Sequence, residues 1–144
     1  MRTLFYSPVN GRDSIGLLVL RLVVGVAFLY HGWGKIQNPT GWMPPDAGIP
    51  GAAQAVAAVS EFGGGIALIL GLLTRLASLG LAATMAVAAY FHISNGDPFV
   101  NPQGGHSWEL AAVYFACALL FLLAGPGSLS LDALVFGRPR ATAA

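Results

Sequence analysis

The chain has 144 residues, of which 56% are hydrophobic and only 9% are charged, and its mean hydropathy is +0.69. Soluble domains carry about a quarter of their residues as charged side chains, so this composition excludes an ordinary soluble protein and indicates an integral membrane protein. The formal net charge is only +1 and the basic residues are scattered, which excludes the clustered basic patch of a nucleic-acid-binding protein.

The first apolar segment, residues 14–34, is long enough to cross a bilayer as a helix. Arg21 lies well inside it. An intramembrane arginine costs on the order of 3 kcal/mol on insertion scales, so Arg21 needs a partner and marks a candidate functional site. Arg2 and Arg12 precede the segment as in a secretory signal, but the segment is longer than a signal-peptide core and carries an arginine at its middle. We therefore expect a retained first span.

Three further apolar segments are each long enough for one crossing: residues 51–74, 76–95 and 107–124. The proline-rich connector 37–50 contains Trp42 and predicts an interfacial loop, because proline stops a helix and tryptophan prefers the headgroup layer. The connector Thr74-Arg75 predicts a tight hairpin, and the Asn/Gly/Asp/Pro-rich connector 95–106 predicts a loop. The sequence thus predicts an all-α fold, a four-helix transmembrane bundle forming a single domain over residues 1–144.

Positive charge is distributed unequally between the two ends of this bundle. Lys35 alone lies at one end, whereas the other end carries most of the arginines: Arg2, Arg12, Arg75, Arg138 and Arg140. By the positive-inside rule, both termini and the short second connector face the cytoplasm, and the two long loops face outward.

Two carboxylates accompany Arg21 in the apolar segments. Glu61 lies near the middle of the second segment and Glu109 in the first turn of the fourth. Arg21 is roughly 10 Å from the cytoplasmic end and Glu61 roughly 14 Å from the outer end, a difference that a long side chain can bridge. We expect Arg21 to pair with Glu61, either as a structural ion pair or as part of a site. Glu109 is then a surplus titratable acid, reached through Lys35, a histidine or water, and these three residues are the candidate catalytic groups.

The remaining polar side chains lie toward the outer ends of the helices. His31, Lys35, His92 and Trp108 are the candidate ligand-binding residues at this mouth. An apolar cavity with a few convergent polar groups suits a quinone, to which an acid could transfer a proton or donate a hydrogen bond. Simpler interpretations stay open: the tryptophans as an interfacial belt, the histidines as solvated groups, and Lys35 as a snorkelling side chain.

Other cofactors fit the sequence less well. His31 and His92 could ligate a b-type haem, but both lie close to the surface. Together with His106 and Glu109 they offer metal-ligand types, yet without the short-range spacing typical of a metal site, so no metal site is predicted. Cys117 is the single cysteine, which excludes an intrachain disulfide and dithiol chemistry, and it is interpreted as an inert core residue.

Dispersed motifs occur along the chain in a recognisable order: Arg21 with Gly25 and Phe28, His31-Gly-Trp-Gly-Lys35, Glu61-Phe-Gly-Gly-Gly, Leu70-Gly-Leu-Leu-Thr-Arg75, Glu109, and Gly125-Pro-Gly-Ser-Leu-Ser-Leu-Asp132. From about residue 13 to 134 this order resembles the DoxX family of small bacterial four-helix membrane proteins. The resemblance implies four spans in the inner membrane with cytoplasmic termini. The family carries charged residues at positions that match Arg21, Glu61 and Glu109, and polar groups at those of His31 and Lys35. The segment Ser128-Leu-Ser-Leu-Asp132 is a variant of the family's shorter turn.

The resemblance also implies a loose link to redox chemistry. One relative is associated with a terminal quinol oxidase, others act in thiosulfate oxidation with quinone as acceptor, and others associate with enzymes of oxidative-stress defence. We therefore expect a small redox-associated component of the bilayer that binds a quinone or similar apolar ligand beside a larger oxidoreductase, and the residues leave open whether it is itself an enzyme. The alternatives are a non-catalytic scaffold and a carrier of small solutes or lipids. Gly- and Ala-rich helix faces would also permit a homo-oligomer.

Overall fold

The computed structural model describes residues 9–137, and these contain helices, turns and loops but no strand. Arg2, Arg138 and Arg140, on which the predicted orientation partly rests, lie outside the described residues. The long helices are α2 (Arg12–Gln37), α3 (Gly51–Leu70), α4 (Thr74–Ser94) and α5 (Glu109–Ala124), and the short elements are the 3-10 turn η1 (Pro45–Ala47) and helix α6 (Leu131–Phe136). Helices α2, α3 and α4 are long and apolar enough to cross a membrane, and α5 is a shorter apolar helix. The predicted all-α membrane bundle is confirmed.

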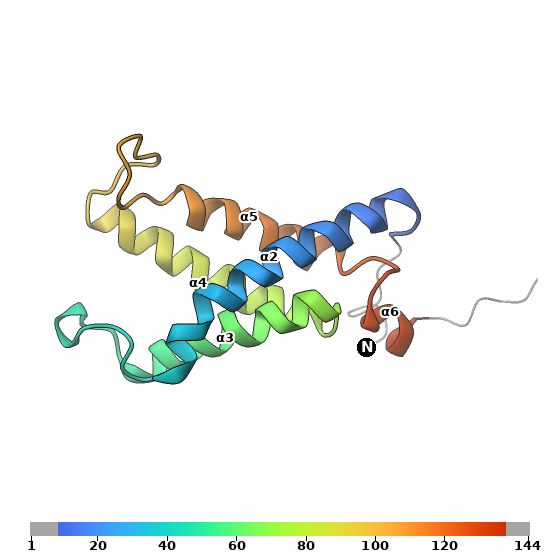
Figure 1. Cartoon of the computed structure of the whole chain (residues 1–144), viewed down its shortest axis with the longest axis horizontal. Coiled ribbons are helices and arrows are strands. Elements are labelled where there is room, and N and C mark those ends of the chain that lie inside the picture. The colour runs from blue at the N-terminus through green and yellow to red at the C-terminus, as the bar shows by residue number, and fades with distance from the viewer. Residues whose placement is uncertain (1–8, 138–144) are drawn as a thin grey trace, which may run out of the picture.

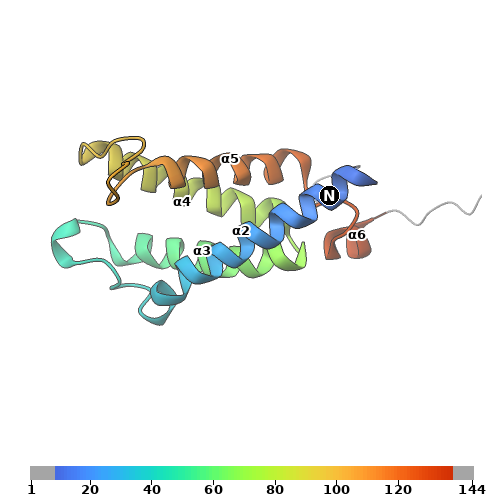
Figure 2. The same cartoon turned by 45° about the horizontal axis from the view of Figure 1, so that its top comes forward.

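The four long helices form two antiparallel pairs. Helix α2 packs on α3, α4 packs on α5, and the pairs meet mainly through α3 and α4, whereas α2 barely touches α5. Both long loops, 38–50 and 95–108, lie at one end of the bundle, which we call the loop end (Figures 1 and 2). The opposite end, which we call the α6 end, holds the start of α2, the α3–α4 turn and α6 (Figure 1).

Glycines allow α2 and α3 to pack backbone against backbone. A Cβ atom added at Gly32 would lie 2.5 Å from the backbone nitrogen of Phe62, and one at Gly25 would lie 2.9 Å from the carbonyl oxygen of Gly65. Small residues have this role in membranes because apolar burial supplies no driving force between helices already surrounded by lipid. The contacts fix the register of α2 against α3, and this register decides which polar groups meet.

The turn between α3 and α4 differs from the prediction. Helix α3 ends at Leu70 rather than at residue 74, because Gly71 adopts the left-handed conformation (φ 65°) and its N–H bonds back to the Leu68 carbonyl. Leu73 also has a positive φ of 50°, which is unusual for a side chain of this size. The connector is therefore residues 71–73, and Thr74 and Arg75 already belong to α4.

Candidate functional site

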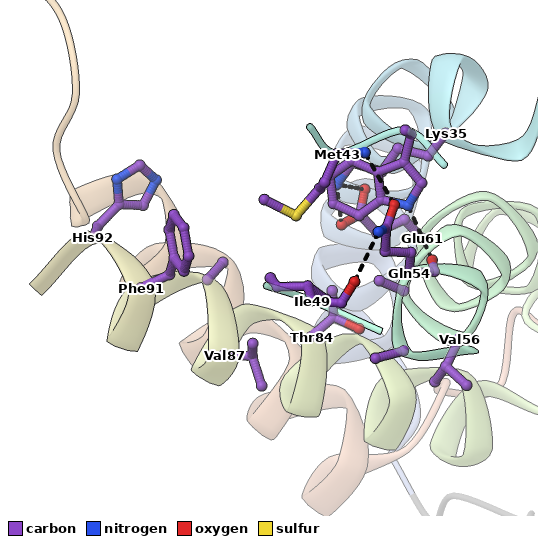
Figure 3. A pocket seen from close by; sticks show the side chains of 14 residues that line it. Lys35, Met43, Ile49, Gln54, Val56, Glu61, Thr84, Val87, Phe91 and His92 are labelled. Carbon is purple, nitrogen blue, oxygen red and sulfur yellow. Dashed lines mark hydrogen bonds and ion pairs between the residues drawn. The ribbon is translucent and has the colours of Figure 1, made fainter. Parts of the chain in front are cut away.

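The central polar contact at the loop end is an ion pair between Lys35 and Glu61. The Lys35 ammonium donates to both Glu61 carboxylate oxygens, at 2.6 and 2.7 Å (Figure 3). Glu61 comes from the middle of α3 and its side chain is 2% exposed, whereas Lys35 comes from the last turn of α2 and is 26% exposed. Glu61 is thus a buried carboxylate neutralised by a cation that still reaches the outside of the protein.

The predicted pairing of Arg21 with Glu61 is wrong, and the helix register explains why. Gly32 packs against Phe62, so Glu61 lies level with the end of α2. Arg21 is 14 positions before Lys35 on the same helix, and hence roughly 20 Å further along its axis. The estimate from the sequence placed the outer ends of the first two helices at one level, whereas the structure staggers them. Lys35 is correspondingly the partner of Glu61 and not only a snorkelling side chain.

Arg21 is instead buried at the α6 end, where it is 1% exposed. Its guanidinium donates a hydrogen bond to the Leu129 carbonyl and interacts electrostatically with Asp132. A Cβ atom at Gly71 would overlap the guanidinium, so only glycine fits beside it. Ser14, which lies nearer the start of α2, contacts the same residue: its hydroxyl oxygen accepts a hydrogen bond from the Leu129 N–H at 3.1 Å. Arg21 therefore joins α2 to the turn and to the segment before α6, at the opposite end from Glu61.

The loop 38–50 covers the Lys35–Glu61 pair. Lys35 Nζ lies 4.5 Å from the centre of the Trp42 ring, a cation–π distance. Buried Gln54 on α3 holds the loop in place: its Oε1 accepts from the Met43 N–H at 2.9 Å, and its Nε2 donates to the Ile49 carbonyl at 3.0 Å. Gln54 was not among the residues expected from the sequence, although a polar amide side chain within an apolar segment indicates a buried hydrogen-bonding partner.

A cavity of about 560 Å³ lies between α3, α4 and this loop (Figure 3). Its walls are mainly apolar, and its polar groups are contributed by the ion pair, Gln54, Thr84 and His92. The lining residues are Lys35, Trp42, Met43, Ile49, Ala53, Gln54, Val56, Ala57, Glu61, Thr84, Val87, Ala88, Phe91 and His92. Pockets that bind small molecules have this volume and this mixture of apolar walls with a few polar groups.

A second cavity of about 210 Å³ lies on the side of the ion pair that faces α5. It is lined by side chains of α2, including His31, and of α5, including Tyr114, whose rings lie 5.9 Å apart. Lys35, Glu61, Ala88 and His92 line both cavities. The ion pair and His92 consequently stand between the two spaces.

The structure groups some of the predicted site residues and separates others. Glu61, Lys35, His31 and His92 line one or both cavities. Three predicted residues lie elsewhere: Arg21 at the α6 end, Glu109 exposed at the start of α5, and Trp108 against the Phe99 ring at 4.4 Å. The three candidate catalytic groups Arg21, Glu61 and Glu109 are therefore not brought together in one site.

Comparison with known proteins gives one family. The DoxX family model matches residues 16–93. The chain is 31% identical to the inner membrane protein YqjF of Escherichia coli, covering 85% of this chain and 94% of the relative. It is 36% identical to an uncharacterized protein of Haemophilus influenzae (81% and 87% covered) and 30% identical to the putative oxidoreductase CatD of Bacillus subtilis (88% and 92% covered). No solved structure matches. With its apolar helices and its inner membrane relatives, this protein of the bacterial inner membrane belongs to the DoxX family.

Proposed function

We propose that the protein binds the ring of a quinone, or a similar apolar molecule with carbonyl oxygens, in the 560 Å³ cavity beside the Lys35–Glu61 ion pair. The observation that carries this proposal is the placement of one buried ion pair in the wall of an otherwise apolar cavity. Apolar walls suit a ring that partitions into the bilayer, and a few fixed polar groups give it orientation.

The ion pair has hydrogen-bonding capacity left for a ligand. A lysine ammonium has three N–H donors, and Lys35 directs two of them to Glu61. The third can donate to a ligand carbonyl oxygen. The aromatic ring of Trp42 and the side chain of Thr84 border the same space, so the ligand ring has both a stacking surface and a further polar neighbour.

The redox context comes from the family. One relative, from Bacillus subtilis, is named a putative oxidoreductase. We propose that this chain supplies the ligand site and that a larger membrane oxidoreductase exchanges electrons with the ligand. In this arrangement both termini face the cytoplasm and the loop end, with the ligand site, lies toward the outer face of the membrane.

The test combines extraction with titration. Organic extracts of the purified full-length protein are analysed for quinones by mass spectrometry, and the protein is then titrated with decylubiquinone and a short-chain menaquinone while tryptophan fluorescence and thermal stability are followed. Binding of either quinone should quench Trp42 and raise the melting temperature, since a ligand that binds the folded state stabilises it.

A matched pair of variants separates site binding from partition into detergent. Ala88→Leu adds bulk where both cavities meet, whereas Ala86→Leu adds the same bulk on the exposed side of the same helix. We expect Ala88→Leu to weaken quinone binding at least tenfold and Ala86→Leu to leave it unchanged, with both proteins folded by circular dichroism. Equal quenching of both variants, or no stabilisation of the unmodified protein, would refute the proposal. A scaffold would instead show lower folded yield for Glu61→Gln with unchanged turnover of its partner per assembled complex.

A further inference from the structure

His92, Asp97 and His106 form a cluster at the loop end, where the last turn of α4 meets the loop 95–108. One potential ligand atom from each residue lies within 4.8 Å of the other two. His92 Nδ1 is 2.7 Å from Asp97 Oδ2, and the rings of His92 and His106 have centres 5.9 Å apart. The side chains of His92 and Asp97 are 30% and 21% exposed, so ions from solution can reach them.

The two ends of the loop between α4 and α5 hold this cluster together. On one side the Asp97 N–H donates to the His92 carbonyl at 3.0 Å, through a turn in which Gly96 has a φ of 79°. On the other side the Trp108 N–H donates to the Pro98 carbonyl at 3.3 Å, which brings the His106 side of the loop back to the end of α4. Ligand atoms from the two ends are therefore placed together before any ion binds, and little ordering remains to oppose binding.

We propose that His92, Asp97 and His106 bind a divalent transition-metal ion of the zinc class. Two imidazole nitrogens and one carboxylate oxygen are the ligand types that Zn²⁺ takes in sites with an open fourth position, which water would fill. Zinc–ligand bonds of about 2.1 Å put ligand atoms about 3.4 Å apart, so small side-chain rotations from the present spacing suffice. The C-terminal end of α4, where His92 lies, adds a favourable partial negative charge.

The site differs from the one that the sequence offered. The sequence grouped His31 and Glu109 with His92 and His106 as residues of metal-ligand type. In the structure His31 and Glu109 lie outside the cluster, and Asp97 belongs to it. The proposal does not depend on quinone binding. Because His92 also lines both cavities, a bound ion would fix one wall of the ligand site.

The experiment uses untagged full-length protein in detergent, treated with a chelator and then titrated with ZnCl₂ in competition with a chromophoric zinc indicator. We expect one Zn²⁺ per chain. His106→Gln and Asp97→Asn should each lower the affinity at least tenfold. The Co²⁺-loaded protein should show visible d–d absorption of a four- or five-coordinate ion, and this absorption should be lost in His106→Gln.

Matched controls are available in the chain. His31→Gln removes a histidine outside the cluster, and Asp46→Asn removes an exposed carboxylate in η1, so both should bind Zn²⁺ as the unmodified protein does. If Zn²⁺ does not bind at one equivalent, or if all four variants bind it equally, the proposal is wrong and His92 and Asp97 form only a hydrogen-bonded pair. Loss of zinc binding with unchanged quinone binding would leave the proposed function intact.

Discussion

Asp132 caps α4 by accepting a hydrogen bond from the Thr74 N–H at 2.9 Å, although the two residues are 58 positions apart. The same carboxylate accepts from the Leu73 N–H at 2.7 Å. The start of a helix leaves backbone N–H groups without partners, and a side-chain oxygen that satisfies them stabilises the helix. Here the cap comes from α6 and not from the residue before the helix, which allows Leu73 to keep its unusual backbone conformation.

Replacing Asp132 with alanine should lower the free energy of unfolding by about 3 kcal/mol, because two charge-assisted hydrogen bonds to the start of α4 are lost. Asp132→Asn keeps one acceptor oxygen, so its free energy of unfolding should lie between those of the unmodified protein and of Asp132→Ala. Unfolding in a denaturing-detergent titration followed by circular dichroism measures the effect. Asp46→Ala, in the exposed turn η1, is the control and should change little. Equal stability of all three variants would show that the cap is dispensable.

Double-mutant cycles should assign the partner of Arg21. We expect a coupling energy of about 1–3 kcal/mol between Arg21→Met and Asp132→Asn, since the Asp132 carboxylate interacts electrostatically with the buried guanidinium. The cycle of Arg21→Met with Glu61→Gln should be additive within about 0.5 kcal/mol, because Arg21 lies at the α6 end whereas Glu61 pairs with Lys35 in the last turn of α2. A large coupling in the second cycle would contradict the helix register described above.

Truncating the two members of the Lys35–Glu61 pair should have unequal effects. Lys35→Ala leaves a carboxylate that is 2% exposed without its cation and should cost about 3–5 kcal/mol of stability. Glu61→Ala leaves a lysine that is 26% exposed and can extend to water, so its cost should be smaller. Comparing the two unfolding free energies tests this. If Glu61→Ala lowered the free energy of unfolding more than Lys35→Ala, the Glu61 carboxylate would have to be neutralised by a group other than Lys35.

Two glycines near the end of α2 provide a test of the close helix packing. Gly32→Ala places a methyl group 2.5 Å from the backbone of Phe62 and should cost about 3 kcal/mol, because the helices must separate. Gly34→Ala meets no atom within 4 Å and should be neutral or slightly stabilising, since alanine is the better helix former. Thermal unfolding of the two variants at matched detergent concentration distinguishes them. Similar melting temperatures would contradict backbone contact at Gly32.

Much of the architecture could be predicted from the sequence, because hydrophobic length and proline-rich breaks are local signals. The boundary at Leu70 could not, since it depends on a left-handed Gly71 and on a cap from Asp132 far along the chain. The short helix α6 was not predicted either. It begins with Ser130, whose side chain accepts from the Ala133 N–H, but six residues are too few for a hydrophobic period to be visible.

The sequence predicted several of the polar residues that line the site, but not which of them form the ion pair. Lys35, Glu61, His31 and His92 were selected because they are polar groups in or near apolar helices, and they do line the cavities. Which cation meets Glu61 depends on how far α3 is displaced along α2, and that displacement is set by backbone contacts at glycines. Depth estimated along separate helices carries no information on such contacts.

The link between Asp132 and the α3–α4 turn has a consequence for the order of synthesis. Leu73 leaves the ribosome 59 residues before the carboxylate that its N–H group will meet. Helices α2 to α5 therefore enter the membrane while the α6 end is still open and Arg21 has neither Leu129 nor Asp132 beside it. A nascent chain released just after α5 would contain all four long helices of residues 9–137 and yet hold the buried Arg21 guanidinium without its partners, so the α6 end can close only after Asp132 has been made.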